Sequence, residues 1–182
     1  MPISRSYLIH SLGDDALLID FGHIIDIELN QYIVGLSEAI RQHALTGVKE
    51  LSVAYASIAV YYDITLGKQR NGSFKNNLQQ AIESIIADFQ PNEKEEARQI
   101  IDIPVCYEAT FAPDLNNLSE EKGISAKEVV ELHCSNVYHV YMIGFLPGFA
   151  YMGKVDEKIC MGRKSKPVPI QKGSVGIAGN QT

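Results

Sequence analysis

The feature of this sequence that most constrains its fold is an apolar run that glycine and proline interrupt. Residues 137–145 are rich in aromatic and β-branched side chains, a composition that predicts a buried strand. Breaks follow at Gly144, Pro147 and Gly148. Three rings surround them, those of Phe145, Phe149 and Tyr151. Such punctuation predicts a tight, rigid turn with aromatic side chains around it.

A cationic segment follows this turn. After Glu157 the sequence has no acidic residue, although the whole chain has a formal net charge of −6. The basic residues of the segment are Lys158, Arg163, Lys164, Lys166 and Lys172. Isolated cations beside rigid Gly and Pro backbone predict a receptor for carboxylate or phosphate, and Arg suits bidentate contact with a planar anion. The alternative is that they are loop charges that keep the segment soluble. Residues 173–179 alternate small and β-branched side chains and predict a closely approached strand.

Length and composition bound the class of protein. The chain has 182 residues, enough for one large domain or two small ones, with 46% hydrophobic and 21% charged residues. No apolar run reaches the roughly 18 residues of a membrane span, and a signal-peptide core is absent. The odd set Cys106, Cys134 and Cys160 predicts free thiols in a reducing cytoplasm and no metal site. An acidic pI near 5.3 argues against a nucleic-acid binder.

Residues 1–90 predict a small α+β sandwich domain with both helices on one face of a sheet. The expected elements begin with strands at 7–10 and 16–21 around a turn at 13–15, followed by a helix with apolar positions from 29 to 40. A bent strand or a pair of strands is expected at 50–62. A second helix is expected behind an N-cap at Ser73, with an apolar stripe from 74 to 89. Core packing is favoured for this last stripe over partner binding. The scattered His10, His23 and His43 lack metal-ligand spacing and predict ordinary roles.

A polar stretch at residues 91–100 predicts a linker between this domain and a second one at residues 101–182. The second domain is expected to begin with an edge strand at 100–107 that contains Pro104. Two helices should follow, one from Asp114 to a stop at Gly123, and one from a capping box at residues 125–128 through His133.

This pair of helices resembles a helix-turn-helix unit. Between Asp114 and Glu131 there are two Lys and five acidic residues, a local charge of 2 − 5 = −3. DNA affinity depends on cations that meet phosphates, so the charge argues against DNA binding.

A resemblance to a known family rests on the C-terminal motifs. The stretch GFLPGFAYMG followed by RKSKPVPIQKGSVGIAGNQT closely resembles the signature of the B subunits of bacterial 5-oxoprolinase. That family also contains Kip-type histidine-kinase inhibitors and allophanate hydrolase subunit 1. The resemblance extends from residues 17–22 through the whole chain and is strongest after residues 103–107.

The resemblance implies a cyclophilin-like β-barrel for residues 101–182, in which the helical pair is an excursion. It also implies one component of an ATP-dependent enzyme that opens 5-oxo-L-proline to L-glutamate together with A and C subunits. The sequence has no G-x-x-x-x-G-K-[ST] loop, so ATP is expected to bind with or through a partner. Ser174 does not lie in a G-x-S-x-G elbow, which argues against a serine hydrolase.

Seven residues form the expected site. His133 is a candidate proton relay, as the resemblance implies; the alternative is that it caps the last carbonyls of its helix. Arg163 or Lys172 would hold the substrate carboxylate. Phe145, Phe149 and Tyr151 would wall the pocket, and Gln181 would offer amide hydrogen bonds. His139 is expected to be a packed residue.

Two alternatives and one departure stand beside this interpretation. The chain could instead inhibit a sensor histidine kinase by binding it through the N-terminal part, without turnover. A prolyl isomerase would rest on fold analogy alone. In relatives the barrel continues beyond the GNQT-type motif, whereas this sequence stops at Thr182. We therefore expect an incomplete barrel whose unpaired strand edges lead either to a homodimer or to a poorly behaved C-terminal half, and little activity from the isolated chain.

Overall fold

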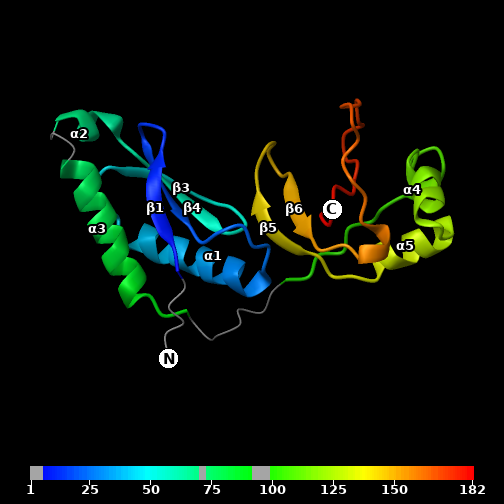
Figure 1. Cartoon of the computed structure of the whole chain (residues 1–182), viewed down its shortest axis with the longest axis horizontal. Coiled ribbons are helices and arrows are strands. Elements are labelled where there is room, and N and C mark those ends of the chain that lie inside the picture. The colour runs from blue at the N-terminus through cyan, green and yellow to red at the C-terminus, as the bar shows by residue number, and fades with distance from the viewer. Residues whose placement is uncertain (1–5, 70–72, 92–98) are drawn as a thin grey trace. The chain divides into compact units, whose positions relative to one another are not determined.

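The computed structural model describes residues 6–69, 73–91 and 99–182, and the chain divides into two compact units, Met1–Glu96 and Ala97–Thr182. Each unit has its own antiparallel sheet and its own helices (Figure 1), so the fold is mixed α+β. The predicted linker at 91–100 falls mostly outside the described residues.

The first unit is built on a four-stranded antiparallel sheet with the strand order β1-β2-β4-β3. Its strands are β1 (Leu8–Leu12), β2 (Ala16–Asp20), β3 (Val48–Val53) and β4 (Ser57–Tyr62). The turn between β1 and β2 uses Gly13 at φ +65°, a conformation that costs glycine little. Residues 50–62, predicted as one bent strand or a pair of strands, contribute to two strands, β3 and β4. The predicted hairpin at residues 7–21 is confirmed as the antiparallel pair β1 and β2.

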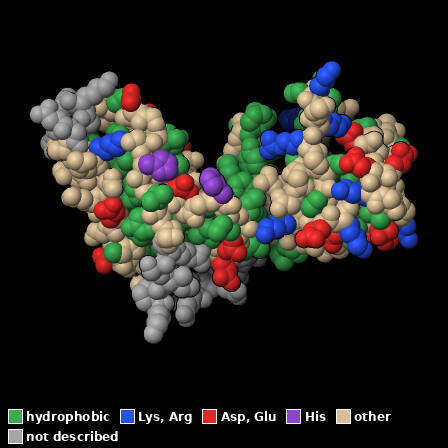
Figure 2. Space-filling model, in the orientation of Figure 1, with side chains coloured by type: hydrophobic (Ala, Val, Ile, Leu, Met, Phe, Trp, Pro, Cys, Tyr) green, Lys and Arg blue, Asp and Glu red, His purple; other side chains and the backbone are tan. Residues whose placement is uncertain are grey.

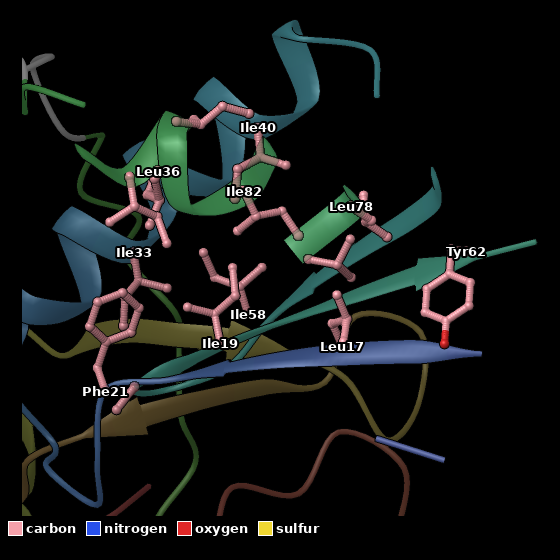
Figure 3. Packing of buried hydrophobic residues seen from close by; sticks show 14 of the residues in the cluster. Leu17, Ile19, Phe21, Ile33, Leu36, Ile40, Ile58, Tyr62, Leu78 and Ile82 are labelled. Atoms are coloured by element: carbon pink, nitrogen blue, oxygen red, sulfur yellow. The ribbon is translucent and has the colours of Figure 1, made fainter. Parts of the chain in front are cut away.

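Helices α1 (Ile27–Gln42) and α3 (Ser73–Asp88) cover one face of this sheet, as predicted (Figure 3). Asp26 caps α1, because its carboxylate accepts a hydrogen bond from the backbone N–H of Leu29 at 2.7 Å. A short helix, α2 (Ile64–Gln69), precedes α3 and was not predicted.

The core of the first unit lies between the helices and the sheet. Its fully buried side chains come from alternate positions of two strands and from one stripe of each helix: Leu17, Ile19, Ile58, Val60, Ile33, Leu36 and Ile82. Burial of each such side chain stabilises the fold by about 1.5–3 kcal/mol. The stripe at 74–89 packs into this core, which confirms the prediction of core packing.

The second unit contains helices α4 (Leu115–Lys122) and α5 (Ala126–Cys134), strands β5 (His139–Ile143) and β6 (Ala150–Gly153), and the short 3-10 helix η1 (Glu157–Ile159). Both predicted helix signals are confirmed. Gly123 ends α4 at φ +65°, and the Ser125 hydroxyl accepts a hydrogen bond from the backbone N–H of Glu128 at 3.1 Å. A small core forms around Val129, Val155 and Ile159.

Two predicted strands of this unit are wrong. Residues 100–107 form no strand, and their side chains at Ile100, Ile101 and Ile103 are 61–70% exposed. Residues 173–179 contribute only isolated bridges, at Ala178 and Gly179. A strand requires neighbouring backbone to pair its N–H and C=O groups, and among residues 99–182 these segments find little or none. The described sheet has two strands and is open, so the cyclophilin-like barrel stays a prediction.

Candidate functional site

His133 is the centre of a hydrogen-bonded group of side chains in the second unit. It lies in the last turn of α5 and is only 9% exposed. The Tyr107 hydroxyl is 2.5 Å from its Nδ1, and the Thr182 hydroxyl is 3.0 Å from its Nε2. Both ring nitrogens thus contact side chains far away in the sequence. The alternative, a histidine that caps its own helix, is not what the ring contacts show.

Polar and aromatic neighbours complete this group. The Tyr138 hydroxyl donates to the carbonyl of His133 at 2.8 Å, and the two rings lie 5.5 Å apart. The Cys134 thiol donates to the Tyr107 hydroxyl at 3.5 Å. Burial lowers the pKa of His133 and raises the pKa of both Tyr107 and Tyr138. At neutral pH the imidazole is therefore uncharged, and both phenols keep their protons.

Gln181 and Thr182 lie along the edge of β6 that does not face β5. The backbone N–H and C=O of Thr182 pair with Met152 at 3.1 and 3.0 Å. Gln181 forms isolated bridges with Gly153 and Ala178, and its side chain is half-buried. This pairing holds the C-terminal motif against the sheet and brings Thr182 to His133. The structure thus places Gln181 next to a residue that contacts His133.

The predicted turn between β5 and β6 is confirmed. The backbone N–H of Gly144 donates to the carbonyl of Phe149 at 3.0 Å, which closes the turn. The Phe145 and Phe149 rings lie 5.8 Å apart, and those of Phe149 and Tyr151 lie 5.0 Å apart, both edge-on. Hydrophobic side chains cover this hairpin at the surface (Figure 2). The three predicted rings therefore form one group.

Phe145 combines two unusual properties. Its side chain is 82% exposed, and its backbone has φ +65°. A bulky residue in the left-handed region costs about 1–2 kcal/mol relative to the ordinary conformation. Strain of this kind concentrates at functional sites.

Lys and Arg side chains are prominent on the second unit, interspersed with acids on its helical part (Figure 2). Lys164 binds Asp114, with Nζ 2.7 Å from Oδ1. Arg163 and Lys172 are both exposed, and within residues 99–182 the structure shows no ion pair for either. It also shows no hydrogen bond there from these two cations to the three rings or to His133. The cations, the rings and the histidine are thus three separate groups in the described contacts.

Two members of the His133 group were missed by sequence reasoning. Tyr107 fell within a predicted strand, and Thr182 was treated only as the end of a motif. Each of these two residues is a polar side chain at the end of a sequence motif. That position alone did not indicate that either residue contacts His133.

The described residues contain no group of three or more His, Cys, Asp or Glu that could hold a metal ion. Cys106, Cys134 and Cys160 are free thiols. Within the same residues, no helix has both the length and the apolar character needed to cross a bilayer.

Comparisons with known proteins bear on the whole chain. The 5-oxoprolinase B subunit of Bacillus subtilis (strain 168) is 36% identical over 185 residues, which is 97% of this chain and 75% of that protein. The 5-oxoprolinase B subunit of Escherichia coli O157:H7 is 44% identical over 85 residues, covering 46% of this chain and 39% of that protein.

Solved structures give the same picture. The crystal structure of TTHA0988 has a TM-score of 0.72 and 27% identity, and the match covers 91% of this chain but only 31% of that one. The K. lactis urea amidolyase shares the fold, with a TM-score of 0.59 and 16% identity over 84% of this chain and 10% of that one.

A family model described as carboxyltransferase domain, subdomain C and D, matches residues 7–182. The match spans both compact units and includes Tyr107, His133 and Thr182. This chain belongs to the carboxyltransferase subdomain C and D family.

Proposed function

We propose that this chain is the B-type component of a cytoplasmic, ATP-dependent 5-oxoprolinase, which opens 5-oxo-L-proline to L-glutamate. The main support is its 36% identity, over 97% of its length, to the 5-oxoprolinase B subunit of Bacillus subtilis. Such a component works in a complex of several chains, and we propose partners of the A and C types.

The proposed reaction explains why several chains are needed. An unstrained five-membered lactam resists hydrolysis because amide resonance makes its carbonyl a poor electrophile. ATP can activate that oxygen as a phosphate ester or make ring opening irreversible. This sequence has no phosphate-binding loop, so we assign ATP to a site formed with or by a partner chain.

The side chains of the second unit suggest how this chain contributes. Arg163 or Lys172 holds the substrate carboxylate, and their exposure leaves them able to bind an anion. Phe145, Phe149 and Tyr151 wall the pocket. Gln181 offers amide hydrogen bonds to the ligand.

His133 has a different part in this proposal, because its ring is buried and both nitrogens are occupied. It relays a proton towards the ligand through Thr182, whose hydroxyl is within hydrogen-bond distance of Nε2. The relay thus runs along described contacts and does not require the imidazole to touch the substrate.

The cyclophilin-like barrel and a homodimer also belong to this proposal. The exposed apolar side chains at residues 100–105 and the open two-stranded sheet are features that additional strands would cover.

A reconstitution experiment tests the proposal. The chain is purified with candidate A and C subunits, and glutamate release from 5-oxoproline is followed with ATP. The Arg163→Ala, Lys172→Ala double variant is expected to raise KM for 5-oxoproline, whereas full activity at low substrate would refute the anion-binding role. The control is Lys127→Ala, which removes one exposed positive charge outside the proposed site; this lysine of α5 pairs with Glu131.

Adding the chain to a sensor histidine kinase distinguishes the alternative function. Inhibition of autophosphorylation without glutamate release in the reconstitution would support a kinase inhibitor instead of an enzyme component.

A further inference from the structure

The two hydrogen bonds to the His133 ring differ in length, and the difference indicates their direction. A hydroxyl can donate or accept, whereas a neutral imidazole has one N–H donor and one bare acceptor nitrogen. The distance of 2.5 Å between the Tyr107 hydroxyl and Nδ1 is shorter than the usual range of bonds that an N–H donates to oxygen, so it favours the Tyr107 O–H as the donor. The distance of 3.0 Å between Nε2 and Thr182 matches the usual length of bonds that an N–H donates.

The surroundings of Tyr107 support the same direction. Its oxygen already accepts a hydrogen bond from the Cys134 thiol at 3.5 Å. Burial keeps the phenol protonated by raising its pKa. The phenol has a single proton, and Nδ1 is the nitrogen beside it. The chain of donors therefore runs from Cys134 to Tyr107, then to His133 and finally to Thr182.

We infer that Tyr107 is a positioning residue, which holds His133 as the neutral tautomer with its proton on Nε2 and thereby orients the Thr182 hydroxyl. Thr182 Oγ1 accepts from Nε2, and the backbone N–H and C=O of Thr182 are paired with Met152. The hydroxyl proton is then the remaining donor of that residue. It is able to bond an oxygen of a ligand, such as a carbonyl or carboxylate.

The tautomer follows from the contacts of this chain alone. The ligand contact of Thr182 rests on the proposed function. The inference also refines that function, because the group presented to the ligand is the Thr182 hydroxyl and not the imidazole itself.

Nuclear magnetic resonance of the full, 15N-labelled chain tests the tautomer. Long-range 1H–15N correlations of a histidine ring show which nitrogen carries the proton. The sequence has five histidines, and the disappearance of one ring in His133→Gln assigns the signal. At pH 7.5 we expect a single Nε2–H tautomer for His133. An Nδ1–H tautomer or a charged ring would overturn the inference.

Two matched Tyr→Phe variants test whether Tyr107 is the residue that fixes the tautomer of His133. Tyr107→Phe removes the donor to Nδ1 and is expected to give a mixture of tautomers. Tyr138→Phe removes a hydroxyl that donates to the backbone carbonyl of His133 and not to a ring nitrogen, and it keeps the ring beside the imidazole, so the single tautomer should remain. If Tyr107→Phe keeps the pure Nε2–H form, or if Tyr138→Phe changes it equally, Tyr107 does not position the ring.

Variants of Thr182 cover the case in which Tyr107→Phe does not fold. Thr182→Ser keeps the hydroxyl and should keep the Nε2–H signal unchanged. Thr182→Val removes the acceptor and should shift the Nε2 proton resonance and speed its exchange with water. Identical spectra for Ser and Val would contradict the bond to Thr182.

Activity measurements distinguish a failure of this inference from a failure of the proposed function. In the reconstituted complex, Tyr107→Phe should lower kcat at least about tenfold with a smaller change in KM. An inactive wild-type complex would count against the proposed function and leave the tautomer result standing. An active complex with unchanged kcat for Tyr107→Phe would refute the positioning role.

Discussion

The Thr182 hydroxyl lies 3.0 Å from Nε2 of His133, although 49 residues separate them in the sequence. The contact joins the end of α5 to the edge of β6 with which Gln181 and Thr182 pair. It therefore stabilises the second unit as well as organising its candidate site.

The buried histidine predicts a pH dependence of stability. Burial lowers the pKa of His133 in the folded state below its ordinary value of 6.5, so the unfolded chain takes up this proton first as the pH falls. The stability that depends on neutral His133 is fully present above pH 6.5 and is lost below it, until the folded-state pKa is reached. The loss has a slope of at most about 1.4 kcal/mol per pH unit. Urea unfolding at pH 7.5 and 5.5 measures it.

The control for this measurement is His133→Gln, which cannot titrate in that range. The difference in unfolding free energy between the two pH values should be smaller in His133→Gln than in the wild type. Equal differences would show that His133 is not the group responsible. The phenols of Tyr107 and Tyr138 keep their protons throughout, since burial raises the pKa of both.

The core of the first unit predicts a large effect for one side chain of α3. Ile82 is 0% exposed between the helices and the sheet, so Ile82→Ala should lower the free energy of unfolding by about 2–5 kcal/mol. Val34 lies on α1 and is 51% exposed, so Val34→Ala should change it by less than about 0.5 kcal/mol. Urea unfolding compares them, and similar losses would contradict the described core.

Alanine substitutions at two glycines distinguish the effect of steric crowding on stability from the effect of backbone conformation. Gly47 has φ +85°, and a Cβ there would lie 2.6 Å from Leu66 and 2.7 Å from Phe74. Gly22 has φ +99°, and among the described residues no atom lies within 4 Å of such a Cβ. Both alanine variants incur backbone strain of about 1–2 kcal/mol, and only Gly47→Ala adds a clash with the core. Its melting temperature should therefore fall further, and equal decreases would exclude the crowding.

The backbone strain at Phe145 and its exposed ring predict opposite effects of a substitution on stability and on substrate binding. Phe145→Asn introduces a residue that tolerates positive φ, so the free energy of unfolding should be unchanged or rise by up to about 1 kcal/mol. In the reconstituted complex KM for 5-oxoproline should rise, because the proposed pocket loses one of its walls. Phe111 is 63% exposed in the same unit, and Phe111→Asn is the control with no expected effect on KM. An unchanged KM for Phe145→Asn would remove the ring from the site.

Sequence reasoning predicted the first unit well because its signals are local. The turn at Gly13 and the helical spacing from Leu29 to Ile40 each lie within one element. Alternation of buried and exposed side chains then fixes which sheet face the helices cover. The missed element, α2, is only six residues long and shows too short a stretch of helical periodicity to predict.

The second unit was less predictable because its contacts are not local. Residues 100–107 have the composition of a strand, but a strand also requires partner backbone, which no composition reveals. The His133 group joins residues 26 and 49 positions apart, and nothing in a single sequence indicates which polar residues meet. The aromatic turn was predictable, since Gly144, Pro147 and the rings lie within one short segment.

The proposal on which the other functional predictions depend is that this chain is a working component of a 5-oxoprolinase. The most direct test titrates the purified chain into fixed amounts of A and C subunits with ATP and measures the initial rate of glutamate release. We expect almost no release without the chain, and a rate that rises and then saturates once the chain matches its partners. A rate that does not depend on the amount of this chain would contradict the proposal.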